Sequence, residues 1–235
     1  MIAFFPGKYS LPARLASCHY NGAAASTAQD RTTRNMSLSD APLGHRVAYP
    51  SEYDPTLLHP IARAENRASL GLGMPLPFHG ADIWTAYELS WLDPKGKPRV
   101  AMAMFTVPAD SPNLIESKSF KLYLNSFNQT RLDGSEALQA RLGQDVGAAA
   151  GAPVEVRIID PRDFARQEIA ELEGVDLDRI DVDIDTYQPA ATLLRCGEGD
   201  EVGETLSSRL LKSNCLVTGQ PDWAVRLDAP RPSRR

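Results

Sequence analysis

The fold is decided by the stretch Ile83-Trp84-Thr85-Ala86-Tyr87-Glu88-Leu89-Ser90-Trp91-Leu92, in which apolar residues recur at every second position. Residues two apart lie on the same face of a β-strand, so one face would carry Ile83, Thr85, Tyr87, Leu89 and Trp91. The turn sequence Asp93-Pro94-Lys95-Gly96-Lys97-Pro98 follows, and an apolar stretch returns at Val100–Val107. This pattern predicts a β-hairpin with one covered face.

Two amphipathic helices are predicted after this hairpin. Asn113 would cap the first, with Glu116 three residues later, and the second would open at Ser135 and end at Gly151. Apolar residues at helical spacing give each helix a buried stripe. These stripes are Phe120, Tyr123, Leu124 and Phe127 in the first helix, and Leu138, Leu142, Val146 and Ala149 in the second.

Two more alternating stretches, Val154–Ile159 and Val182–Tyr187, complete a ββααββ order. Antiparallel hairpins around a helix pair predict an α+β unit, with both helices on one face of the sheet. Glu204–Val217 and Asp222–Leu227 then resemble the opening hairpin of a second such unit. We expect that second unit to be incomplete.

Composition indicates an ordinary globular protein. The 235 residues are 43% hydrophobic and 23% charged, and the formal charge of −5 argues against binding to nucleic acid. The three cysteines form no CxxC pair, which fits a reducing compartment, and we expect a cytoplasmic protein. No apolar run reaches the ~20 residues of a membrane helix.

The chain is expected to divide into four parts. Residues 1–35 would be a disordered upstream extension, 36–78 a lead-in segment, and 79–190 the first unit. Residues 191–235 would be the incomplete second unit, ending in an irregular basic tail rich in arginine and proline. We expect the native coding sequence to continue beyond Trp223 in another reading frame.

One pair of residues carries candidate chemistry. Cys215 ends an apolar stretch, and Asp222 follows seven residues later, past a Gly-Gln-Pro turn. A hairpin would bring thiol and carboxyl to one small site, where the thiolate attacks an electrophilic carbon and the acid protonates the atom that gains charge. The alternative is a buried cysteine and a turn aspartate. The histidines lack metal-ligand spacing, so we expect no metal.

Three stretches of the sequence closely resemble the QueF family, the NADPH-dependent 7-cyano-7-deazaguanine reductases of queuosine biosynthesis, a tRNA modification. The resemblance covers about Tyr53 to Trp223 and is to the long, bimodular form, which has two tunnelling-fold units. The stretches are Asp82–Trp91, Glu116–Leu124 within Asn113–Arg131, and Lys212–Cys215 with Gln220–Trp223.

The resemblance implies a reaction and a set of residues. A nitrile would be reduced to a primary amine, with Cys215 forming a covalent thioimide and Asp222 acting as the proton donor. Ile115, Glu116 and Ser117 would contact the substrate base, and Ser117 and Lys118 would contact the cofactor NADPH. The intact family would act as a homodimer on the free base 7-cyano-7-deazaguanine, away from membranes and nucleic acid.

This sequence also departs from the family. Long members continue past the Gln-Pro-Asp-Trp motif with a His-Glu pair for the base and an Arg-Gly pair for NADPH, and neither pair is found here. Two alternatives to an active reductase therefore stay open. One is an inactive member that keeps base binding or covalent capture, and the other is a purine- or pterin-binding tunnelling-fold protein with no redox role. For Glu116 the alternative is a role as a helix cap only.

Overall fold

The computed structural model describes residues 2–3, 49–76, 78–167, 174–187, 193, 205–214 and 219–228, without the side chains of 2, 3, 213 and 222–228. The chain forms two compact units, residues 1–169 and 170–235. The boundary expected from the sequence, between 190 and 191, falls inside the second unit. Of the predicted upstream extension 1–35, only Ile2–Ala3 is described.

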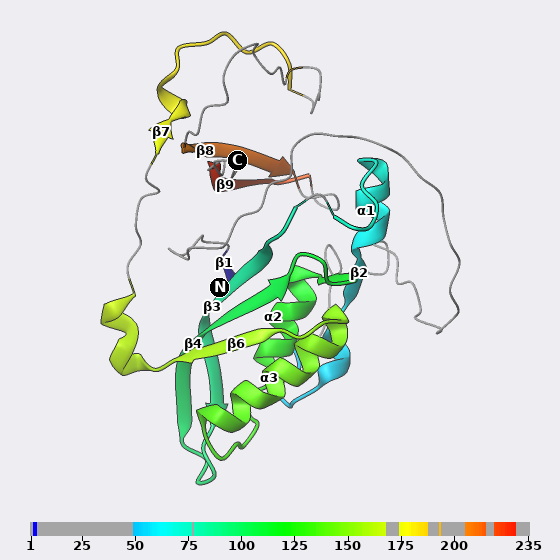
Figure 1. Ribbon diagram of the computed structural model, residues 1–235. Helices are drawn as coiled ribbons and strands as arrows, with labels where there is room; N and C mark the ends of the chain where they lie inside the picture. Colours follow the sequence, from blue (N-terminus) through cyan, green and yellow to red (C-terminus); the bar gives the residue numbers. More distant parts are fainter. Residues whose placement is uncertain are drawn as a thin grey trace, which may run out of the picture. The chain divides into compact units, whose positions relative to one another are not determined.

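The first unit contains a four-stranded antiparallel sheet (Figure 1). Its strands, in the order β1-β3-β4-β6, are β1 (Ile2–Ala3), β3 (Ala81–Leu92), β4 (Pro98–Pro108) and β6 (Glu155–Ile159). The predicted hairpin is β3–β4, so this prediction is confirmed. Its turn is held by Asp93, whose carboxylate accepts the N–H groups of Lys95 at 3.0 Å and Lys97 at 2.9 Å.

A β-bulge interrupts the predicted alternation along β3. Ala86 pairs with Ala103 and Leu89 pairs with Ala101, so Tyr87 and Glu88 together stand opposite one residue of β4. The extra residue switches the faces of the strand. The core therefore receives Trp84 and Ala86 before the bulge and Leu89 and Trp91 after it, and the single face predicted for residues 83 to 91 is wrong.

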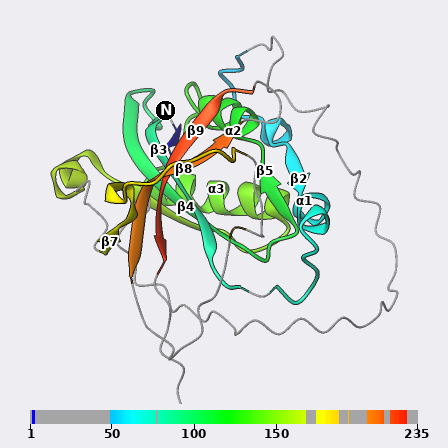
Figure 2. The ribbon, with the colours of Figure 1, turned by 90° about the horizontal axis from the view of Figure 1, so that it is seen from above.

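Helices α2 (Ser117–Asn125) and α3 (Ser135–Ala150) cover one face of this sheet (Figures 1 and 2). The α3 prediction is confirmed: the helix opens at Ser135, and Gly151 ends it in a left-handed conformation with φ 72°. Both predicted stripes enter a single core, and each fully buried side chain contributes about 1.5–3 kcal/mol. Members of this core include Phe105, Phe120, Tyr123, Phe127, Leu138, Leu142 and Val146.

The lead-in segment forms the 3₁₀ turn η2 (Pro55–Leu57), strand β2 (Pro60–Ala62) and helix α1 (Arg63–Ser69). Strand β2 pairs antiparallel with β5 (Asn113–Ile115). Leu58 belongs to the buried core and Tyr53 packs against it. The lead-in therefore contributes to the folded unit.

The second unit contains strands β7 (Val175–Asp176), β8 (Leu206–Asn214) and β9 (Pro221–Asp228), with the 3₁₀ turn η4 (Leu177–Arg179) after β7. The predicted strand Val182–Tyr187 is wrong, because these residues form no regular element. Val182 is 59% and Ile184 64% exposed. An alternating pattern makes a strand only where a neighbouring strand pairs with it. No helix in the described residues is long and apolar enough to cross a membrane.

Candidate functional site

The first candidate site is the junction between β5 and α2. Glu116 follows β5 and caps α2, because its carboxylate accepts the N–H groups of Lys118 at 2.8 Å and Ser119 at 2.7 Å. The predicted cap at Asn113 is therefore wrong. Asn113 is held in β5 by pairing with β2, and its amide donates to the carbonyl of Ala149 at 3.0 Å.

Strand β2 and Ser119 fix the backbone at this junction. The N–H of Glu116 donates to the carbonyl of His59 at 2.9 Å, and the N–H of His59 donates to Ser119 Oγ at 3.0 Å. The same hydroxyl donates to the carbonyl of Glu116 at 2.7 Å. The sequence analysis missed His59 and Ser119, since the contact spans 60 positions of the chain and neither residue belongs to a local motif.

The predicted substrate and cofactor residues lie consecutively at this junction. Ile115 ends β5 and Glu116 is the cap; they are 3% and 4% exposed. Ser117 and Lys118 open α2 and are half-buried. The carboxylate uses only two of its roughly four lone-pair positions on the helix, so it can accept further hydrogen bonds. The Lys118 ammonium suits an anionic group such as a cofactor phosphate.

A separate candidate site is the β8–β9 hairpin of residues 170–235. The two stretches predicted to open a second hairpin do pair, with Asn214 opposite Pro221 and Ser213 opposite Asp222. Cys215 lies outside the described residues. For Asp222 the backbone position in β9 is described and the side chain is not.

Tyr53 of the lead-in segment and Tyr123 of α2 form a pair of tyrosines with raised pKa. The hydroxyls of Tyr53 and Tyr123 both donate to Asp145 Oδ2 at 2.7 Å, and Arg141 lies 4.9 Å from the centre of the Tyr53 ring. Burial and then the bond to Asp145 raise the pKa of both tyrosines. Tyr123 is fully buried in the core, so this network has a structural role. No group of three or more metal-ligating side chains occurs in the described part of the chain.

Known proteins resemble this chain, including the residues of the β5–α2 junction. Residues 49–158 match the family described as nitrile reductase, 7-cyano-7-deazaguanine-reductase N-term. NADPH-dependent 7-cyano-7-deazaguanine reductase of Bordetella parapertussis is 67% identical over 189 residues, covering 80% of this chain and 69% of the relative. The chain belongs to the 7-cyano-7-deazaguanine reductase family.

Other family members show the same level of coverage. The reductase of Cupriavidus pinatubonensis is 56% identical over 192 residues, covering 80% of this chain and 69% of the relative. That of Ralstonia nicotianae is 57% identical over 186 residues, covering 78% and 67%. The QueF resemblance inferred from the motifs is thus confirmed. The β5–α2 junction lies within the residues matched by the family model, and the β8–β9 hairpin lies beyond them.

Proposed function

We propose that this chain catalyses the NADPH-dependent reduction of 7-cyano-7-deazaguanine to 7-aminomethyl-7-deazaguanine, a step of queuosine biosynthesis. The observation that carries the proposal is the 67% identity to a reductase named for this substrate and cofactor. The nitrile takes up two hydrides and two protons, so two NADPH are consumed for each amine formed. NADPH supplies the hydrides when bound.

In the proposed reaction the chain's residues handle the base, the carbon and the protons. Glu116 accepts hydrogen bonds from the N–H edge of the base, beside Ile115 and Ser117. The Cys215 thiolate forms a C–S bond to the nitrile carbon while Asp222 protonates the nitrile nitrogen, giving a thioimide. After the first hydride addition the C–S bond breaks. This step releases the Cys215 thiolate and forms an imine, which accepts the second hydride. Ser117 and Lys118 would bind the cofactor.

The two hairpins support the placement of Cys215 and Asp222, because they share one register. In the first, Leu92 pairs with Pro98 and the bulge lies between Ala86 and Leu89. In the second, Asn214 pairs with Pro221 and the bulge lies between Ser208 and Leu211, at the same distance from the strand end. This match also supports two tunnelling-fold units, with β8–β9 as the opening hairpin of the second.

The shared register makes Cys215 equivalent to Asp93 and Asp222 equivalent to Arg99. Each pair consists of the first residue after one strand and the second residue of the next. Asp93 and Arg99 are in contact, at 3.0 Å. The second turn is one residue longer, residues 215–220 against 93–97. The first hairpin therefore gives a geometric precedent for a thiol and a carboxyl meeting in the second.

The remaining expectations from the sequence are part of this proposal: a homodimer, a cytoplasmic location and a free base, not tRNA, as the substrate. The decisive experiment is the intact mass of the chain after incubation with 7-cyano-7-deazaguanine without NADPH. We expect a gain of one substrate mass, which Cys215→Ala abolishes and Cys196→Ala retains. With NADPH added, we expect two cofactors oxidised for each substrate.

The alternatives predict other outcomes. An adduct without NADPH oxidation would indicate an inactive family member that keeps only covalent capture by Cys215. Substrate binding with no adduct in the folded protein would favour a base-binding protein with no redox role, and would contradict the proposed thioimide.

A further inference from the structure

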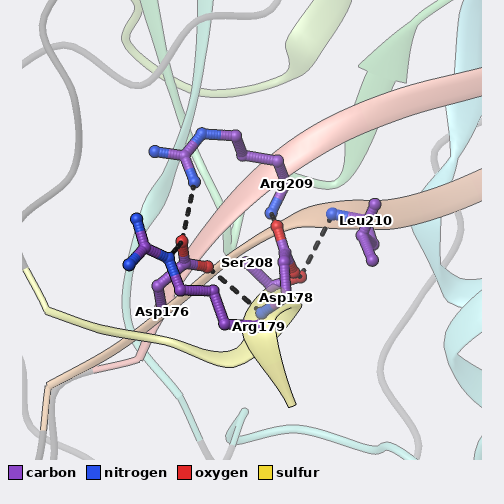
Figure 3. Close-up of polar contacts among 6 residues, drawn as sticks. All are labelled: Asp176, Asp178, Arg179, Ser208, Arg209 and Leu210. Atoms are coloured by element: carbon purple, nitrogen blue, oxygen red, sulfur yellow. Dashed lines mark hydrogen bonds and ion pairs between the residues drawn. The ribbon is translucent and has the colours of Figure 1, made fainter. Parts of the chain in front are cut away.

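Asp178, on the 3₁₀ turn η4, anchors the bulge of β8 within the second unit (Figure 3). Its carboxylate accepts the N–H of Arg209 at 2.8 Å and the hydroxyl of Ser208 at 2.7 Å. Both residues lie at the register shift between Ser208 and Leu211, where the pairing with β9 is interrupted. A bulge leaves backbone groups out of the ladder, and these groups need other partners. The contact therefore stabilises β8 itself.

In the first unit a comparable contact, made by Arg63, connects two separate sheets. Arg63 follows directly after β2 of the two-stranded β2–β5 sheet and is the first residue of α1. Its guanidinium donates from Nη2 to Asp82 in β3 of the four-stranded sheet, and from Nε to Ser111 Oγ at 3.1 Å. The side chain of Arg63 is 12% exposed and that of Asp82 is 26% exposed. The ion pair is thus largely shielded from solvent and is screened less than a surface pair.

Ser111 extends this connection to β5. It is buried in the loop between β4 and β5, and its hydroxyl donates to the carbonyl of Asn113, the first residue of β5, at 2.9 Å. The backbone N–H of Arg63 also donates to the carbonyl of Pro112 at 3.0 Å. Arg63 therefore holds both residues that immediately precede β5, Ser111 through its side chain and Pro112 through its backbone.

Strand β5 depends on such anchors because it is short. It pairs with β2 over three residues, and a two-stranded ladder of this size is not stable by itself. Another anchor is the amide of Asn113, which donates to the carbonyl of Ala149 in α3. The strand ends at Ile115, and Glu116, the proposed acceptor for the base, follows at once. A shift of β5 would move Glu116 with it, and a hydrogen bond weakens outside a narrow range of distance and angle.

We propose that Arg63 is a positioning residue for the nitrile reduction: by joining Asp82 to Ser111 it fixes where β5 presents Glu116 to the base. This inference rests on the proposed function. A guanidinium suits the role because it is planar and binds two acceptors in a fixed geometry, whereas a lysine ammonium is a point charge on a flexible stem. Loss of Arg63 should therefore raise the KM for the nitrile more than it lowers kcat.

The test is a double-mutant cycle between positions 63 and 116, read by isothermal titration calorimetry with 7-aminomethyl-7-deazaguanine. This amine has no nitrile and forms no thioimide, so its dissociation constant reports binding of the base alone. In the unsubstituted protein, Arg63→Ala should raise the dissociation constant about tenfold, the size of one charged hydrogen bond. In the Glu116→Gln variant it should raise the constant less than about twofold, because the carboxylate that Arg63 positions is gone.

Three further variants separate positioning from stability. Arg67→Ala removes the other arginine of α1 that binds this loop, at the carbonyl of Ala109, and should change the dissociation constant less than about twofold. Arg63→Lys keeps the charge without the planar fork and should not restore affinity. Ser111→Ala keeps the ion pair with Asp82 and breaks the connection to β5. It should weaken binding as Arg63→Ala does, and it covers the case in which Arg63→Ala does not fold.

The outcomes distinguish this inference from the proposed function. If Arg63→Ala weakens binding equally in the unsubstituted protein and in the Glu116→Gln variant, Arg63 does not act through Glu116 and the inference is overturned. Equal effects of Arg67→Ala and Arg63→Ala would overturn it too, since any loss of loop anchoring would then suffice. So would an unsubstituted protein that does not bind the amine. If the coupling is found but the nitrile causes no NADPH oxidation, Arg63 still positions Glu116 and the proposed function fails.

Discussion

Asp93 and Arg99 form an ion pair of 3.0 Å across the turn that joins β3 to β4. The N–H groups of Lys97 and Lys95, together with Arg99, hold the pKa of Asp93 below its usual range, so the pair is charged at neutral pH. In the second hairpin Asp222 has the register position of Arg99, and Cys215 follows Asn214 in the sequence as Asp93 follows Leu92. An electrostatic turn contact in one hairpin thus corresponds to the proposed nucleophile and acid in the other.

This correspondence predicts an engineered disulfide. Asp222→Cys should form a disulfide with Cys215 under mild oxidation by oxidised glutathione, because the proposed reaction needs the two side chains to face one another and a disulfide needs a short Cβ–Cβ separation. Peptide mapping and loss of two free thiols would detect it. Trp223→Cys, one position along, is the control. Equal cross-linking of both variants would show that the pair does not face as the first hairpin suggests.

Glu116 should affect both stability and substrate affinity. Glu116→Ala removes both acceptors of the α2 cap and should lower the free energy of unfolding by about 1–2 kcal/mol. Glu116→Gln keeps one acceptor oxygen and should cost less. Both variants should raise the KM for 7-cyano-7-deazaguanine at least tenfold, since neither retains a carboxylate for the base.

The matched control is Glu136→Gln, which changes an exposed acid in the first turn of α3. Urea unfolding and steady-state kinetics measure the two effects separately. A loss of stability with unchanged KM would mean that Glu116 is only a helix cap.

Asp145 should be a large determinant of stability, because it accepts two tyrosine hydroxyls at one oxygen. Asp145→Ala should lower the free energy of unfolding by about 2–4 kcal/mol, since it leaves the buried Tyr123 hydroxyl without its acceptor. Tyr53→Phe removes one of the two bonds and should cost about 1 kcal/mol. Urea unfolding checks both values. Equal costs for the two variants would argue against a shared acceptor.

Stability should also fall in alkali through Tyr123. Burial, and then the bond to Asp145, raise the pKa of its hydroxyl, so the folded state favours the protonated phenol. The resulting stabilisation is fully present below pH 10, the ordinary pKa of tyrosine, and is lost as the pH rises above it. Urea midpoints between pH 8 and 11 should therefore fall more steeply for the unsubstituted protein than for Tyr123→Phe. Parallel curves would contradict this assignment.

Strand alternation, as at Ile83–Leu92, predicts that a strand exists but not which of its residues are buried. One extra residue at Tyr87–Glu88 reverses the faces, and no composition signal marks it. The stretch Val182–Tyr187 shows the same limit, because its alternation is present without a partner strand. For the candidate site, the resemblance to the QueF family predicted Ile115 through Lys118 as one group. His59, Ser119 and Asp178 act through contacts that are distant in sequence.

The sequence by itself determined the β3–β4 and β8–β9 hairpins and the helix from Ser135 to Gly151. These elements depend on turn residues, caps and periodicities that act over a few positions. Only the tertiary structure decided that Glu116 rather than Asn113 caps α2, because β2 pairs with Asn113–Ile115 and holds them extended. It also decided the register of β8, where an aspartate 30 positions away binds the bulge. Both outcomes depend on hydrogen bonds between segments that only folding brings together.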